Sequence, residues 1–337
     1  MDNKTLTIVL CQTRESNLTY ESLVSKVLLP LESDLAFCGS AGDLLMSQLD
    51  PIISNSRYVW NFPEPNNWEE ACDAISTDFG AWRDLSRLSP MFLGGTGFEN
   101  TTGSGLIIMY WREILRKNLT KEILDRYKWF VITRSDFFWK IPHPKIHYLE
   151  EDTIYLLDGQ KYGGFSDRHI IFHKNHSEKI LSFAEPIFND ASSLKDLLSP
   201  KKRGLNPETY LAFIANHYGL TQKIKFLPYL GYTIRSPETK TRWSKGVYSK
   251  KHGLFIKYPD ELRQTNFNSI YLKSQGDWCK YLNNKGYLRL YIHKYALKYV
   301  SRSCRDLSKF MVQIGWYYNG LRNKSKKFRK KFFLIIF

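Results

Sequence analysis

Short apolar runs alternate with longer stretches of mixed polarity along the first 260 residues. Seven runs have the length and the β-branched or aromatic content of buried strands: residues 5–11, 34–39, 57–62, 129–133, 153–157, 170–173 and 224–234. Apolar residues recur at helical spacing in residues 18–31, 68–87, 106–127, 177–188 and 210–218. This alternation predicts an α/β fold with right-handed crossovers and a mostly parallel central sheet flanked by helices. Residues 247–258 have the pattern of a hairpin.

The run Trp129–Thr133 has the composition of a central strand, and it ends at Arg134-Ser135-Asp136. In an open α/β sheet, ligands bind outside the carboxyl ends of the strands, so Arg134 and Asp136 stand where chemistry is expected. The alternative is a solvated ion pair that closes an ordinary strand. Aromatic residues on both sides of the pair argue against an exposed strand end.

A polar loop precedes the strand at residues 170–173. It contains Gly163-Gly164, where the backbone can adopt conformations or close approaches that other residues resist. Asp167, Arg168 and His169 then place three functional groups directly before the strand. The pattern fits a binding loop and equally a turn closed by a salt bridge.

Glu208 lies in a strong helix-start signal, Asn206-Pro207-Glu208-Thr209, with a capping residue followed by proline. A carboxylate in the first helical turn stabilises the helix dipole, which is one explanation for Glu208. The other is a general base that is positioned by a rigid backbone.

Composition and short motifs exclude several classes of protein. No apolar run approaches the roughly 18 residues of a transmembrane helix, and the N-terminus lacks the pattern of a signal peptide. The five cysteines are scattered without CxxC spacing, which favours reduced thiols in a cytoplasmic protein. The glycine-rich residues 91–105 match neither a P-loop nor a dinucleotide fingerprint, and we expect a connector there.

The net charge of +16 comes mainly from the C-terminal end of the chain. Residues 280–337 contain 15 of the 49 Lys and Arg residues and one of the 33 acidic residues, Asp306. The remainder is close to neutral, so the main domain is not expected to bind nucleic acid. The basic cluster from Lys324 to Lys331, followed by six apolar residues, suits an anionic membrane surface; the alternative is a solvated tail.

Taken together, several segments resemble a family of GT-A-type glycosyltransferases found in surface-polysaccharide clusters and in large viruses. The matching segments are Cys11-Gln12-Thr13-Arg14, residues 132–137, residues 162–169, Arg235 and residues 241–244. The resemblance covers about residues 5 to 258. It implies a GT-A-like catalytic domain over residues 1–260, and we expect residues 261–337 to form a basic, aromatic, mainly helical extension.

The resemblance implies a nucleotide-sugar donor and a divalent cation, Mn²⁺ or Mg²⁺, held by an Asp-x-Asp pair. This chain has Arg134-Ser135-Asp136 at that position, with one carboxylate instead of two. Asp136 could still hold a cation together with phosphate oxygens. Alternatively, Arg134 could neutralise the leaving diphosphate itself.

The resulting hypothesis is transfer of a sugar to a hydroxyl of a glycan or lipid-linked acceptor. The expected catalytic residues are Asp136, Asp167 and Glu208. The expected donor-binding residues are Gln12, Arg14, Arg134, Asp136, Gly163 and Gly164. The expected sugar- or acceptor-binding residues are Arg168, His169, Arg235, Arg242 and Trp243. A cytoplasmic enzyme at the inner face of a membrane would fit the basic tail.

Two other classes of function remain open at this point. The missing first aspartate fits an inactive GT-A-like protein that binds nucleotides or glycans without turnover. The basic tail and its tyrosines fit a nucleic-acid binder, in which the polar strand ends would have no role.

Overall fold

The computed structural model describes most of the first compact unit, residues 1–276. The described residues are 5–42, 49–78, 80–89, 92–93, 105–159, 161–201, 205–239, 244–275 and 278. The predictions for Arg242, Trp243, the glycine-rich segment 94–104 and the basic tail 279–337 lie outside the described residues.

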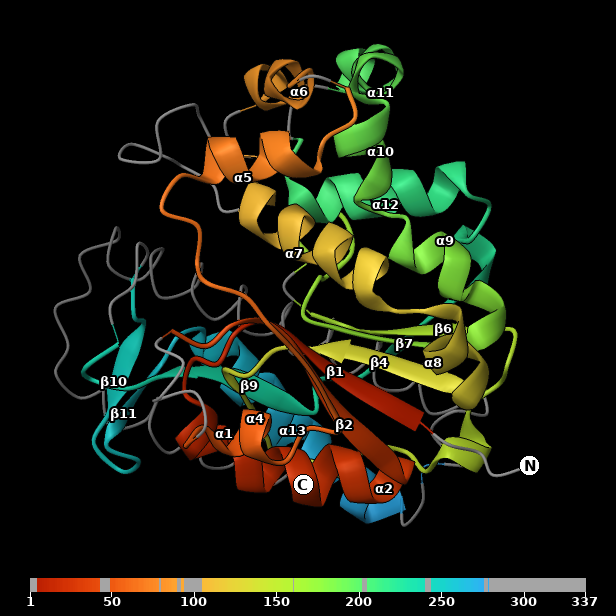
Figure 1. Ribbon diagram of the computed structural model, residues 1–337. Coiled ribbons are helices and arrows are strands. Elements are labelled where there is room, and N and C mark those ends of the chain that lie inside the picture. Colours follow the sequence, from red (N-terminus) through yellow and green to blue (C-terminus); the bar gives the residue numbers. More distant parts are fainter. Residues whose placement is uncertain are drawn as a thin grey trace, which may run out of the picture. The chain divides into compact units, whose positions relative to one another are not determined.

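A seven-stranded sheet with the order β3-β2-β1-β4-β7-β6-β8 forms the centre of this unit (Figure 1). Its strands are β1 (Thr5–Gln12), β2 (Ser33–Ser40), β3 (Tyr58–Asn61), β4 (Trp129–Thr133), β6 (Ile154–Leu157), β7 (His169–His173) and β8 (Ile224–Leu227). All neighbouring pairs are parallel except those that β7 makes with β4 and β6. The predicted α/β class, with a mostly parallel sheet flanked by helices, is therefore confirmed.

Helices cover both faces of the large sheet. Figure 1 shows α7, α9 and α12 over one face, with α5, α6, α10 and α11 beyond them, and α1, α2 and α4 on the opposite face. The helices are α1 (Ser16–Leu23), α2 (Leu29–Leu31), α4 (Pro51–Ser54), α5 (Trp68–Ile75), α6 (Trp82–Leu88), α7 (Gly105–Asn118), α8 (Lys121–Arg126), α9 (Ser177–Leu181), α10 (Glu185–Asn189), α11 (Ala191–Leu198), α12 (Pro207–His217) and α13 (Pro259–Gln275). No helix in this part of the chain is long and apolar enough to cross a membrane.

A second, four-stranded sheet has the order β10-β11-β9-β5 and antiparallel pairing throughout. Its strands are β5 (Phe137–Trp139), β9 (Gly231–Arg235), β10 (Val247–Ser249) and β11 (Leu254–Ile256). The hairpin predicted at residues 247–258 is confirmed as β10 and β11. The chain enters β5 directly after Asp136, so this small sheet meets the large one at the end of β4.

The prediction of one strand over residues 224–234 is wrong. The segment forms β8 in the large sheet and β9 in the small sheet, separated at Pro228. Proline has no N–H to donate to a strand ladder, so the run cannot continue as one strand. The predicted helix over residues 68–87 is likewise two helices, α5 and α6, with Gly80 at φ +81 between them.

Helix α13 is attached to β9 by buried polar side chains. The Thr265 hydroxyl donates to the Gly231 carbonyl (2.6 Å), and the buried Glu261 carboxylate accepts from the Thr233 N–H (2.8 Å). The compact unit ends at Gly276, beyond the boundary at residue 260 that we predicted from the sequence. Helix α13 therefore belongs to the first unit.

Candidate functional site

The carboxyl ends of β1 and β4 lie side by side because the two strands are parallel and Val9 pairs with Thr133. The turn after β4 is tied to β1 and α1 by Ser135. Its hydroxyl donates to the Gln12 carbonyl (2.5 Å), and its carbonyl accepts from the Thr19 hydroxyl (2.5 Å). This turn holds Arg134 and Asp136 at the sheet edge that sequence analysis indicated.

Asp136 is buried between two arginines. Arg134 donates to both carboxylate oxygens, from Nε to Oδ1 (3.0 Å) and from Nη2 to Oδ2 (2.8 Å). Arg235, at the end of β9, places Nη1 at 2.7 Å from Oδ2. Burial opposes ionisation, but the Arg134 and Arg235 charges outweigh it and hold the pKa of Asp136 well below its usual range. Asp136 is therefore an ionised, fully partnered carboxylate.

These contacts do not fit the ligand role that the resemblance implies for Asp136. A divalent cation would have to displace guanidinium N–H donors from both carboxylate oxygens. Among the residues that the structure describes, no group of three or more His, Cys, Asp or Glu side chains could hold a metal ion. The donor set around Asp136 is cationic, which is the opposite of what Mg²⁺ or Mn²⁺ requires.

Further basic side chains surround this pair. Arg168 is buried, forms an ion pair with Glu261 of α13, and lies over the Tyr258 ring at 4.5 Å. Lys257 follows β11, and its pKa is lowered to about 7 by burial and by the positive charge of Arg235. Arg14, in the turn after β1, is exposed and interacts electrostatically with Asp136. The strand ends thus carry an excess of positive charge.

The Gly163-Gly164 loop packs against the start of α12. The Phe165 N–H donates to the Glu208 carbonyl (2.9 Å), and a Cβ on Gly164 would lie 1.9 Å from that oxygen. Asn206 caps α12 by accepting from the Thr209 N–H (2.8 Å), and its amide donates to the Tyr162 carbonyl (3.0 Å). Glycine is required at position 164 because the two backbones touch.

This packing brings Asp167 and Glu208 to the same edge as Arg134. An oxygen of Asp167 lies 4.0 Å from Arg134 Nη1. Burial and the negative charge of Asp167 raise the pKa of Glu208 to about 7. A carboxylate with this pKa exchanges protons near neutral pH, as a general base requires.

The other predicted site residues differ in how far they are buried. Gln12 donates to a Glu64 oxygen at the surface (2.9 Å). His169 is buried, with Nε2 at 3.3 Å from Nε2 of His143 and its ring against Trp139. Arg235 is also fully buried, so it faces Asp136 and not the solvent. His169 and Arg235 therefore pack in the interior next to the site and do not face the solvent.

Sequence analysis missed three charged residues around the site. Lys257 directly follows strand β11, Glu261 lies in the first turn of α13, and Arg112 lies on α7. Arg112 is buried, interacts electrostatically with Asp167, and has an Nε without a partner among the described residues. A basic residue close to the apolar residues Met109, Trp111 and Leu115 in the helix was the available signal.

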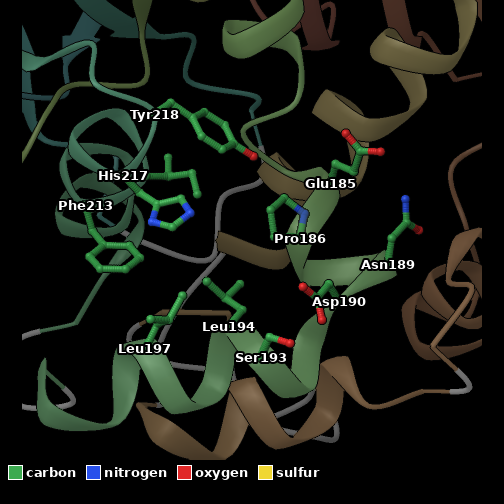
Figure 2. Close-up of a pocket in the computed structure, with 11 residues that line it drawn as sticks. Glu185, Pro186, Asn189, Asp190, Ser193, Leu194, Leu197, Phe213, His217 and Tyr218 are labelled. Atoms are coloured by element: carbon green, nitrogen blue, oxygen red, sulfur yellow. The ribbon is translucent and has the colours of Figure 1, made fainter.

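A separate cavity of about 310 Å³ lies among α10, α11 and α12 (Figure 2). Glu185, Asp190, Phe213 and His217 are among its lining residues. None of the described candidate residues lines it. The cavity and the candidate site share α12, which carries Glu208 in its first turn and Phe213 and His217 in its second half.

Comparisons with known proteins find similarity at the level of structure. No family model matches the chain, and no curated protein matches it in sequence. Among solved structures, the fold is similar to that of mouse xyloside xylosyltransferase 1 in its apo form, with a TM-score of 0.38 and 12% sequence identity. The similarity covers 67% of this chain and 85% of that chain.

Proposed function

We propose that this protein is a glycosyltransferase that moves a sugar from a nucleotide-sugar donor to an acceptor hydroxyl. The observation that carries the proposal is the position of Glu208. Its carboxylate, with a pKa of about 7, belongs to the same group of charged side chains as Asp167 and Arg134 at the carboxyl ends of β1 and β4. Transfer from an anionic donor requires a base that takes the acceptor proton and positive charge that stabilises the leaving group, and this edge of the sheet has both.

In the proposed reaction, the acceptor oxygen attacks the anomeric carbon of the donor sugar and its proton passes to the Glu208 carboxylate. The bond from the anomeric carbon to the diphosphate breaks, and its electron pair stays on the phosphate oxygen. Arg134 and Arg14 stabilise the negative charge that develops there. Burial, together with the negative charge of Asp167, keeps the pKa of Glu208 high enough for proton uptake at neutral pH. Attack by a single activated acceptor would invert the anomeric centre.

The proposal includes a setting for the reaction. The acceptor would be a glycan or a lipid-linked hydroxyl, used in the synthesis of surface polysaccharide or glycoconjugate. The enzyme would work at the inner face of a membrane, held there by its basic C-terminal residues. The motif resemblance and the charge distribution along the chain support this setting.

The test is a panel of uridine, guanosine, cytidine and thymidine diphosphate sugars, with release of the nucleoside diphosphate as the signal. We expect Glu208→Gln to lower kcat by about 10²-fold or more. Glu150→Gln is the matched control, because Glu150 is an exposed carboxylate that pairs with Lys225. Since the base must be deprotonated, kcat of the unaltered enzyme should rise as the pH increases through about 7.

Two outcomes would contradict the proposal. Tight binding of a nucleotide sugar without transfer or hydrolysis would favour the inactive binding protein, a reading that the fully partnered Asp136 also supports. Equal activity of Glu208→Gln and Glu150→Gln would remove Glu208 from the reaction.

A further inference from the structure

Lys257 is positioned by the small sheet next to the paired Asp136. Its N–H donates to the Thr233 carbonyl of β9 (3.0 Å), and Thr233 in turn pairs with Phe137 of β5. The pairing of β11, β9 and β5 therefore brings Lys257, Arg235 and Asp136 close together. The Lys257 ammonium interacts electrostatically with all of Arg235, Arg134, Asp136 and Arg168.

The positive charges in this group exceed the negative ones. Asp136 neutralises part of the charge of Arg134 and Arg235, an Asp167 oxygen lies 4.0 Å from Arg134, and Glu261 pairs with Arg168. Within the described chain, neither the half-buried Lys257 ammonium nor the Arg14 guanidinium forms an ion pair. A desolvated cation beside other cations is costly unless an anion joins it.

Arg235 adds a buried positive charge to this group that is only partly satisfied. It is fully buried, yet its Nε and Nη2 atoms have no hydrogen-bond partner among the described residues. Buried polar groups normally find partners, and a charged group left without one is expensive. The basic side chains of this group therefore carry more positive charge than the acidic side chains beside them neutralise.

We propose that Lys257, together with Arg134 and Arg14, binds the diphosphate of the donor in place of a divalent cation. This inference rests on the proposed glycosyl transfer. When the bond to the anomeric carbon breaks, the electron pair stays on the diphosphate oxygen, and the Lys257 ammonium donates a hydrogen bond to that anion without giving up its proton. A divalent cation would be repelled by the same side chains.

The experiment measures binding of uridine, guanosine, cytidine and thymidine diphosphates to the full-length protein by calorimetry, in EDTA and separately with Mn²⁺. We expect one of them to bind in EDTA. Lys257→Gln should weaken that binding by about 10- to 100-fold, the range expected for a hydrogen bond to a charged group. Lys257→Arg should keep most of it. Lys250→Gln, in the exposed turn of the same hairpin, should bind like the unaltered protein.

Thermal unfolding without ligand separates a binding role from a structural one. Removing a cation from a cationic group should leave the melting temperature of Lys257→Gln unchanged or higher, whereas loss of a structural contact would lower it. Binding that requires Mn²⁺, or equal binding by Lys257→Gln, would overturn the inference and leave the proposed transfer intact. Absence of binding under both conditions would overturn the inference and the proposed function together.

Discussion

Asp136 takes its properties from the two arginines that contact it. Replacing Asp136 with Asn leaves the buried Arg235 without a carboxylate partner and leaves Arg134 with one acceptor oxygen and an NH2 donor in place of the other. We therefore predict that Asp136→Asn lowers the free energy of unfolding by about 3–5 kcal/mol, the cost of breaking a buried ion pair from one side. Urea unfolding in the presence of EDTA measures this change.

The same measurement distinguishes an internal ion pair from a metal site. A carboxylate that serves only as a cation ligand contributes little to the stability of the cation-free protein. Asp196→Asn, at an exposed carboxylate of α11, is the control and should unfold like the unaltered protein. If Asp136→Asn matched this control, Asp136 would not be the internal anion described above.

The sequence indicates which residues stand at strand ends, but not which residues they contact. Arg134 and Asp136 could be assigned to the sheet edge because an apolar run stops directly before them. The contact with Arg235 depends on the pairing of β5 with β9, which no local pattern reveals. His169 shows the converse, since it follows a polar loop in sequence but its ring is buried against His143 and Trp139.

At the scale of elements, the contact between the Gly163-Gly164 loop and α12 positions Glu208. A Cβ at position 164 would collide with the Glu208 carbonyl, so Gly164→Ala must push the loop away from the helix start. We predict a loss of about 1–3 kcal/mol in unfolding free energy, typical of overpacking, and a lower kcat because Glu208 moves relative to Arg134. Urea unfolding and steady-state kinetics measure the two effects.

Gly253→Ala is the matched control for this substitution. Gly253 lies in the β10–β11 turn at φ +65, with nothing within 4 Å of an added Cβ. Its replacement costs only the strain of a left-handed backbone, about 1–2 kcal/mol, and should leave kcat unchanged. A Gly164→Ala enzyme with unaltered kcat would show that the loop does not position Glu208.

The element pattern could be predicted wherever a single local signal dominates. The strands of the large sheet follow from their apolar runs, and the start of α12 follows from Asn206 and Pro207. Two errors arose where a breaker lies inside an apolar stretch, at Pro228 between β8 and β9 and near Gly80 between α5 and α6. Both stretches keep their apolar pattern across the break because both halves pack in the protein interior. The helices predicted over residues 106–127 and 177–188 are also each two helices, α7 with α8 and α9 with α10.

At the scale of the whole molecule, the charge is divided unevenly between two parts of the chain. The compact unit ends at Gly276, and residues 280–337 carry most of the net positive charge. Within the compact unit, acidic and basic residues nearly balance in number, so the positive group around Asp136 is a local arrangement. The tail is the part of the chain whose charge could act over a large surface.

We predict that the full-length protein binds vesicles containing anionic lipid through this tail. Each basic residue near an anionic surface contributes on the order of 1 kcal/mol, and the apolar residues after Lys331 add insertion into the interface. Replacing the six basic residues from Lys324 to Lys331 with Gln should strongly weaken sedimentation with anionic vesicles. Neither the unaltered protein nor the variant should bind neutral vesicles strongly. Raising the salt concentration should release the unaltered protein from anionic vesicles, because salt screens exposed charges. Equal sedimentation of the variant and the unaltered protein with anionic vesicles would show that these residues do not hold the protein on the membrane.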